Sequence, residues 1–204
     1  MVTASAAPAA AAQMRYDITF TDTGTLNGVA FTDQSVDISM IGDPGALTPQ
    51  TPFPGFTVET IDPLVSATVS IGGGPAATFD FATRLGLTTV DNGGFETLFF
   101  SRTGVLGSDI ADLVLAVDPA TFDFSKPMAP LATPFPLFDT STDTTPIQTS
   151  QGVLIFTDQA PATDGTFAIA GVPEPAAWAL MLTGFFSAGA ALRRRRRHTP
   201  VCQA

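Results

Sequence analysis

Cysteine and histidine are almost absent from this chain of 204 residues. Each occurs once, close to the C-terminus, as Cys202 and His198. A single cysteine excludes an intramolecular disulfide and any zinc site built from cysteines. Because no histidine precedes residue 198, the body of the chain cannot contain a Ser-His-Asp or Cys-His centre, in which an imidazole acts as the base.

Basic residues are also scarce, with nine lysines and arginines against nineteen acidic residues. Five of the nine form one block, Arg193 to Arg197. Residues 13–172 carry 4 basic and 18 acidic side chains, a net charge of −14. This balance argues against nucleic acid as a partner, since phosphate binding needs lysine and arginine. An acidic surface suits an exported body, a cation-binding surface or simple solubility.

Helical periodicity is missing from most of the chain, and its 18 glycines and 17 prolines break long helices. Apolar residues instead alternate with polar ones, as in Val36, Ile38 and Met40, which is the pattern of a half-buried strand. Asn27-Gly28 lies between two such runs and predicts a two-residue hairpin turn. Further strands are predicted at Leu64–Ile71, Ala77–Phe81, Gly86–Val90, Phe95–Phe100, Leu113–Val117, Val153–Phe156 and Thr166–Ala170.

These short strands predict an all-β fold, a β-sandwich or jelly-roll-like body over residues 13–171. The 17 phenylalanines, against one tyrosine and one tryptophan, indicate filler for the core of two packed sheets. Ser108 to Val117 is the exception, with the pattern of a short helix opening into a strand. Two proline-rich segments, Asp43 to Phe56 and Ser125 to Pro146, are predicted to be loops.

Candidate chemistry in the body is limited to carboxylates. Glu59 and Glu96 are its only glutamates, and a glycosidase needs a carboxylate pair. Two glutamates in a domain of this size are more often exposed surface acids than a catalytic pair. No enzyme is therefore predicted. Asp91, Asn92, Asp158 and Asp164 lie in glycine-rich turns of the kind that hold calcium, but no turn has the EF-hand spacing. Asx turns explain them without a metal, and no cofactor is expected.

The longest uncharged run, Ala176 to Leu192, directly precedes the arginine block. As a helix its 17 residues would be about 25 Å long, slightly under the ~30 Å hydrocarbon core, and the arginines can snorkel. Trp178 lies where an interfacial aromatic belongs. Arginines stay on the cytoplasmic side, so this transmembrane helix would leave the body outside the membrane. The Ala-rich residues 1–12 are interpreted as the remnant of a signal peptide or as a flexible tail.

Four elements occur in order here: Val172-Pro173-Glu174-Pro175, then Trp178-Ala179, the apolar helix and Arg193–Arg197. Together, residues 172–197 closely resemble the PEP-CTERM protein-sorting signal in its PEPxxWA variant, which is typical of Gram-negative alphaproteobacteria. The same C-terminal domain is sometimes named after ice-binding proteins that carry it. The chain departs from that pattern in showing no recognisable signal peptide and in continuing for residues 198–204, a short cytoplasmic tail.

The resemblance implies export, transient retention in the inner membrane and cleavage near the PEP motif by an exosortase. That partner is a membrane cysteine peptidase, usually encoded beside exopolysaccharide genes. Pro173, Glu174, Pro175 and Trp178 would form the sorting motif, and Arg193, Arg194, Arg195, Arg196 and Arg197 the membrane stop. The sequence thus predicts a non-enzymatic surface or matrix protein, with exopolysaccharide as a possible partner. A carbohydrate-, calcium- or ice-binding module and a permanently anchored protein stay open as alternatives.

Overall fold

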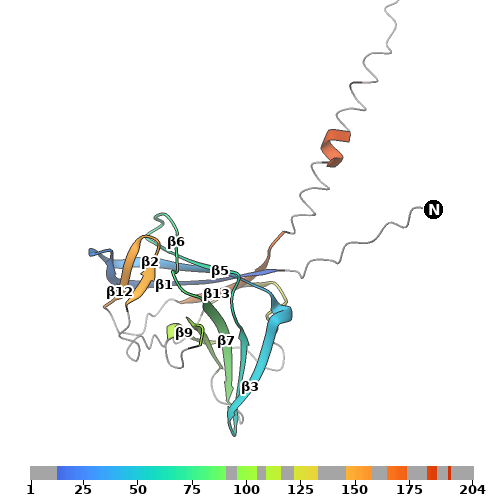
Figure 1. The fold of residues 1–204 in the computed structure, drawn as a ribbon, viewed down its shortest axis with the longest axis horizontal. Coiled ribbons are helices and arrows are strands. Elements are labelled where there is room, and N and C mark those ends of the chain that lie inside the picture. Colours follow the sequence, from blue (N-terminus) through green and yellow to red (C-terminus); the bar gives the residue numbers. More distant parts are fainter. Residues whose placement is uncertain are drawn as a thin grey trace, which may run out of the picture. The chain divides into compact units, whose positions relative to one another are not determined.

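The structure is a computed structural model that describes residues 13–90, 96–104, 109–115, 122–132, 146–157, 165–173, 183–187 and 193. Within these ranges the chain is all-β, with two antiparallel sheets packed as a sandwich (Figure 1). The all-β prediction is therefore confirmed, and the compact unit that contains the strands ends at Gly171.

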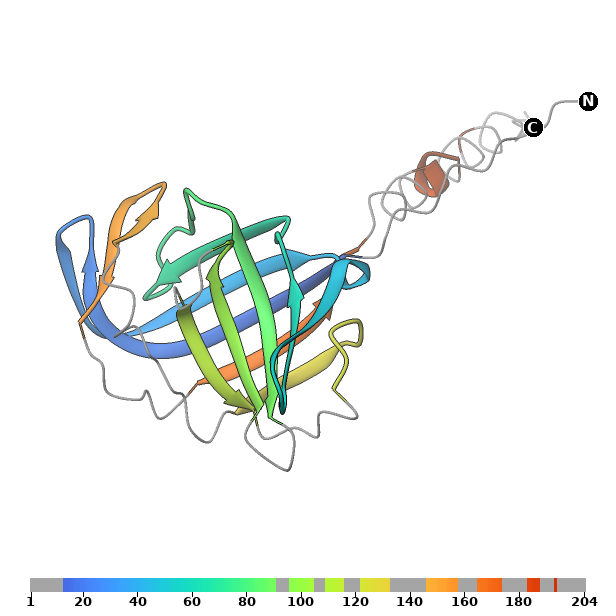
Figure 2. The same cartoon turned by 60° about the horizontal axis from the view of Figure 1, so that its bottom comes forward.

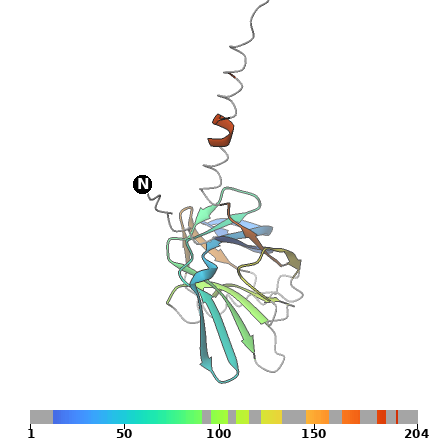
Figure 3. The same ribbon diagram turned by 90° about the vertical axis from the view of Figure 1, so that its right-hand side faces the viewer.

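The first sheet has the order β10-β13-β1-β2-β5-β6, and a β11–β12 hairpin joins it through β1. Its strands are β1 Met14–Leu26, β2 Val29–Gly42, β5 Ser66–Ile71, β6 Ala77–Thr78, β10 Met128–Ala132, β11 Ile147–Thr149, β12 Gly152–Phe156 and β13 Thr166–Gly171. The second sheet has the order β3-β4-β7-β8-β9, with strands β3 Leu47–Phe53, β4 Phe56–Ile61, β7 Thr83–Val90, β8 Glu96–Arg102 and β9 Asp109–Leu115. A short 3-10 turn, Pro44–Ala46, leads from the first sheet to the second. Figure 3 shows the second sheet lying against one face of the first.

The predicted turn at Asn27-Gly28 is confirmed. β1 ends at Leu26 and β2 begins at Val29, and the two turn residues have φ of 50° and 78°. Both angles lie in the left-handed region that asparagine and glycine tolerate, as a two-residue hairpin turn requires. The turn sets a long antiparallel register from Leu26↔Val29 to Met14↔Gly42.

The first sheet closes on itself at the end where this hairpin lies. β1 pairs with β13 as far as Thr19, and beyond a register shift between Asp22 and Gly24 it pairs with β12. Next to β12 in the sheet lies β11. An isolated bridge between Thr149 of β11 and Phe79 joins β11 to the segment after β6. The amide of Ser150 donates to the carbonyl of Thr78 at 2.8 Å. The strands β1, β2, β5, β6, β11 and β12 therefore form a circuit that the single Phe79–Thr149 bridge closes; Figure 2 shows the β11–β12 hairpin at this end of the sheet.

The core lies between the two sheets and is rich in phenylalanine. Tyr16, Ile18 and Phe20 alternate along β1 and are fully buried. From the second sheet Leu85, Leu98 and Phe100 face them and are also fully buried. Phe79 and Phe100 pack edge to face with ring centroids 5.2 Å apart, a favourable aromatic geometry.

The predicted short helix within Ser108 to Val117 is wrong, because Asp109–Leu115 is strand β9 and pairs with β8. Ile110, Leu113 and Val114 are all buried, although adjacent residues of a strand point to opposite faces. A strand buried on both faces has a continuous apolar run, which periodicity alone does not separate from a buried helix.

Both proline-rich segments contain a strand, so their assignment as loops is wrong in part. Pro49 lies in β3 and Pro130 in β10, and each of these strands is at the edge of its sheet. An edge strand tolerates proline because one side of it makes no ladder hydrogen bonds. At the β3–β4 turn, Gly55 has a φ of 84° after Pro54, as in a type II turn.

The predicted transmembrane helix falls mostly outside the described residues. Of this segment the structure describes Thr183 to Ser187, which is helical, and the Ser187 hydroxyl donates to the carbonyl of Thr183. In the part of the chain that the structure describes, no helix is both long and apolar enough to span a membrane.

The single tyrosine, Tyr16, has a polar partner in the core. Its hydroxyl donates to the Phe124 carbonyl at 3.0 Å, and the two rings pack edge to face. Burial, together with the negative charges of Asp43 and Asp123, holds the pKa of Tyr16 well above its usual value. The Asp123 side chain accepts from Ser125 and pairs with Lys126 at 2.9 Å, bonds that lower its own pKa to about 2 and hold this turn in place.

We expect Tyr16→Phe to lower the free energy of unfolding by about 1–2 kcal/mol, because it leaves the buried Phe124 carbonyl without its donor. Urea unfolding of the variant and of the unmodified chain measures this difference. An unchanged midpoint would show that the hydroxyl makes no net contribution to stability.

Candidate functional site

The structure does not bring the two predicted carboxylates into one described site. Glu59 lies in β4 opposite Leu87 of β7, and Glu96 is the first residue of β8, opposite Leu115. β7 lies between their strands, and Glu96 is two residues along β8 from Leu98, the residue in line with Glu59, so the two Cα atoms are about 12 Å apart. The side chain of Glu96 is outside the described part of the structure.

The calcium candidates Asp91, Asn92, Asp158 and Asp164 all lie outside the described residues. Elsewhere, the described residues contain no cluster of three or more histidine, cysteine or acidic side chains that could hold a metal ion. Of the sorting motif, Pro173 is described and is exposed two residues after β13, whereas Glu174, Pro175 and Trp178 are outside the described residues. Arg193 is described, but Arg194–Arg197 are not.

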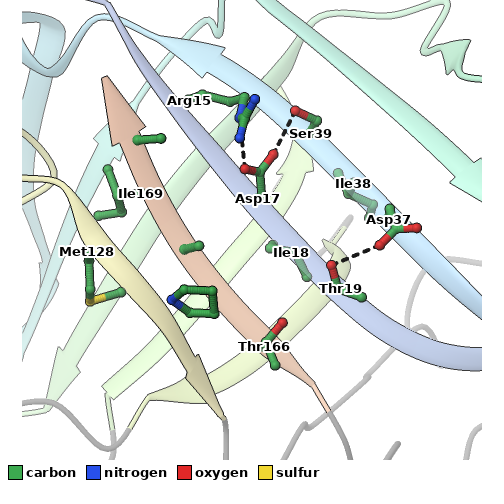
Figure 4. A pocket seen from close by; sticks show the side chains of 13 residues that line it. Arg15, Asp17, Ile18, Thr19, Asp37, Ile38, Ser39, Met128, Thr166 and Ile169 are labelled. Atoms are coloured by element: carbon green, nitrogen blue, oxygen red, sulfur yellow. Dashed lines mark hydrogen bonds and ion pairs between the residues drawn. The ribbon is translucent and has the colours of Figure 1, made fainter. Parts of the chain in front are cut away.

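A feature that the sequence did not predict is a hollow of about 560 Å³ on the outer face of the first sheet. It extends over β10, β13, β1 and β2, the four strands that lie next to one another in Figure 4. The inner face of this sheet packs into the core. The hollow therefore lies on the face of the antiparallel sheet that is open to solvent.

The hollow forms because small side chains lie between larger ones. Ala168 and Ala170, with Thr166, are the outer residues of β13. Met128 and Pro130 of β10 line one side of them. On the other side the register sets Arg15 opposite Ala170 and Asp17 opposite Ala168. The methyl groups of alanine cannot fill the space between these neighbours.

Hydrogen bonds hold the polar side of the hollow in a defined arrangement (Figure 4). Arg15 Nε donates to Asp17 Oδ2 at 2.8 Å, and Ser39 Oγ donates to Asp17 Oδ1 at 2.8 Å. One row further along the strands, Thr19 Oγ1 donates to Asp37 Oδ1 at 2.9 Å. Two carboxylates and one guanidinium thus have fixed neighbours before any ligand arrives.

The formal charge of this polar side is −1, from one arginine and two aspartates. The hollow has no histidine or cysteine among its lining residues. What it offers is a set of hydrogen-bond donors and acceptors beside an apolar floor, an arrangement suited to binding a polar molecule.

Sequence reasoning missed this site although its residues carry a signal. Arg15, Asp17 and Thr19 are the polar positions of an alternating strand, and Asp37 and Ser39 are those of the next. The alternation shows that they face solvent. Their proximity to Ala168 and Ala170, about 150 residues away along the chain, depends on the pairing of β1 with β13.

Comparisons of the chain with protein-family models, curated proteins and solved structures find no match.

Proposed function

We propose that this chain is an exported protein of a Gram-negative bacterium, sorted to the cell surface or extracellular matrix through its C-terminal segment. The β-sheet body then has a structural or interaction role and not an enzymatic one. The observation that carries this proposal is the order of elements in residues 172–197: Pro-Glu-Pro, a tryptophan, a long uncharged run and five arginines.

The charge distribution supports this orientation. An arginine block at the end of an apolar helix resists translocation, so residues 193–197 stay in the cytoplasm and Ala176–Leu192 spans the inner membrane. The body, with a net charge of −14 over residues 13–172, lies on the outer side. The arginine block sets this orientation, and the acidic body is compatible with it.

The position of the motif supports cleavage by an exosortase-type membrane peptidase. β13 is an interior strand, paired with both β1 and β10, and it ends at Gly171. Pro173 follows it and is exposed. Proline on both sides of Glu174 disfavours a helix and favours the extended conformation in which proteases bind peptides. Cleavage after residue 173 would remove no residue of the two sheets.

The test is the mass of the mature C-terminus in cells that contain the sorting peptidase and in cells that lack its gene. We expect a C-terminus near the Pro-Glu-Pro motif in the first strain and an intact one in the second. Glu174→Ala should block the cleavage, whereas the matched change Glu59→Ala, in β4 of the body, should not.

An intact C-terminus in both strains would contradict sorting by cleavage. The protein would then be permanently anchored by its C-terminal helix. A C-terminus near the motif in both strains would show that a different protease acts on it.

A second candidate function is favoured by one observation, the polar hollow on the outer face of the first sheet. It supports the alternative that the body is a ligand-binding β-module. An exported body would meet exopolysaccharide, the partner that we propose on the strength of the tail.

A further inference from the structure

We propose that the hollow over β10, β13, β1 and β2 binds a neutral polyhydroxylated molecule, such as a segment of an uncharged glycan. This inference rests on the proposed function in so far as an exported body meets such polymers. The site itself is argued from its shape, its hydrogen-bonding groups and its charge.

The shape fits a small ring-shaped ligand. A volume of about 560 Å³ lies within the range of ~300–1,000 Å³ that is usual for small-molecule sites. Ala168 and Ala170 form an apolar floor, and Pro130 of β10 adds an apolar edge to it. A sugar ring presents C–H groups on its faces, which such a floor can cover, and hydroxyl groups around its edge.

The hydrogen-bonding groups select hydroxyls. Arg15 is 54% exposed, and its described hydrogen bond uses Nε, so the four N–H donors of its two Nη groups face the hollow or solvent. Asp17 and Asp37 are acceptors that retain lone pairs beyond their bonds to Arg15 and Ser39 and to Thr19 and Ser35. A hydroxyl both donates and accepts, so adjacent hydroxyls can bond a guanidinium and a carboxylate at once.

The rows of the sheet space these groups regularly. The Asp17–Ser39 row and the Thr19–Asp37 row are successive on this face, so they are about 7 Å apart. A ligand along β1 would therefore meet polar groups in two places. Since protein bonds already orient both carboxylates, binding loses little side-chain entropy.

Charge excludes the other ligand classes. An anionic ligand would face two carboxylates beside one arginine, on a body that carries −14 overall. A calcium ion needs about six to eight oxygen ligands, and here a guanidinium occupies the space next to Asp17. An apolar ligand would displace water from the exposed Nη groups of Arg15 and from the free lone pairs of Asp17 and Asp37 without replacing those hydrogen bonds. A neutral polyol satisfies all of these conditions.

The experiment is calorimetric titration of the full chain, held in a zwitterionic detergent without a sugar headgroup. The probes are neutral oligosaccharides (cellohexaose, maltohexaose, mannohexaose and laminarihexaose) and an anionic one, hexagalacturonate. We expect at least one neutral probe to bind and hexagalacturonate not to bind. Ala168→Leu, which fills the floor, and Arg15→Ala, which removes the donors, should each weaken binding by about tenfold or more.

Ser66→Leu is the matched control, because Ser66 lies on the same face in β5 but outside the hollow, and we expect its affinity to stay within about twofold. Thermal unfolding of each variant separates loss of binding from loss of fold. The proposed site would be wrong if no neutral probe bound, or if hexagalacturonate bound more tightly than the neutral probes. It would also be wrong if the Ala168→Leu variant bound a neutral probe as tightly as the unmodified chain. None of these results bears on C-terminal cleavage, which is measured in cells, so the two proposals fail independently.

Discussion

Replacing Phe100 with alanine is expected to lower the free energy of unfolding by about 3–5 kcal/mol. Phe100 is fully buried in β8, an interior strand of the second sheet. It packs against Phe79, whose backbone bridge to Thr149 helps to close the circuit of strands in the first sheet. Removing the ring leaves a cavity between the sheets, because neighbouring β-strands cannot collapse into it.

Urea unfolding followed by near-ultraviolet circular dichroism would measure this loss, with Phe56→Ala as the control. Phe56 is 40% exposed beside the β3–β4 turn, so its truncation should cost about 1 kcal/mol or less. If both variants lost the same stability, Phe100 would not be a central core residue, and this packing of the two sheets would be wrong.

Gly24→Ala is expected to destabilise the chain by about 3 kcal/mol, through overpacking against the backbone. A Cβ atom at this position would overlap the carbonyl oxygen of Ile155 and approach Phe31 Cζ to 2.8 Å. Phe31 is a side chain and can move, but Ile155 belongs to β12, which pairs with β1 at this point. Only separation of the two strands would relieve the overlap.

Hydrogen exchange would localise this effect. The amides of Asn27 and Thr157, which donate to Val153 and Thr23 across the β1–β12 junction, should lose protection, while amides between β7 and β8 keep it. Gly171→Ala is the control, since a Cβ there meets no atom within 4 Å. Equal protection at Asn27 and Thr157 in both variants would contradict the β1–β12 pairing.

Most strands could be predicted from the sequence because their signals are local. Val36, Ile38 and Met40 alternate with polar residues, and all three are buried in β2. Asn27-Gly28 needs only its two neighbours to form a turn of positive φ. The boundaries were less accurate, since the strand predicted from Leu64 begins at Ser66 and the one predicted from Gly86 begins at Thr83.

The errors arose where a local signal depends on the position of a strand within its sheet. The apolar run in β9 imitates a helix because both of its faces are buried. Pro49 and Pro130 favour loops, yet they lie in edge strands that do not need every backbone donor. Whether a strand is central or at an edge depends on its partners, which are not neighbours in sequence.

The sequence by itself determined the all-β class, the β1–β2 turn and the absence of histidine from the body, because these follow from residue types and short spacings. It also contains the whole basis for the proposed sorting of the chain, an ordered motif of 26 residues. Only the tertiary structure decided that the first sheet closes through Phe79 and Thr149, and that Arg15 and Asp17 lie beside Ala168 and Ala170. The physical reason is register: pairing between distant strands brings those side chains together, and no local pattern records which strands will pair.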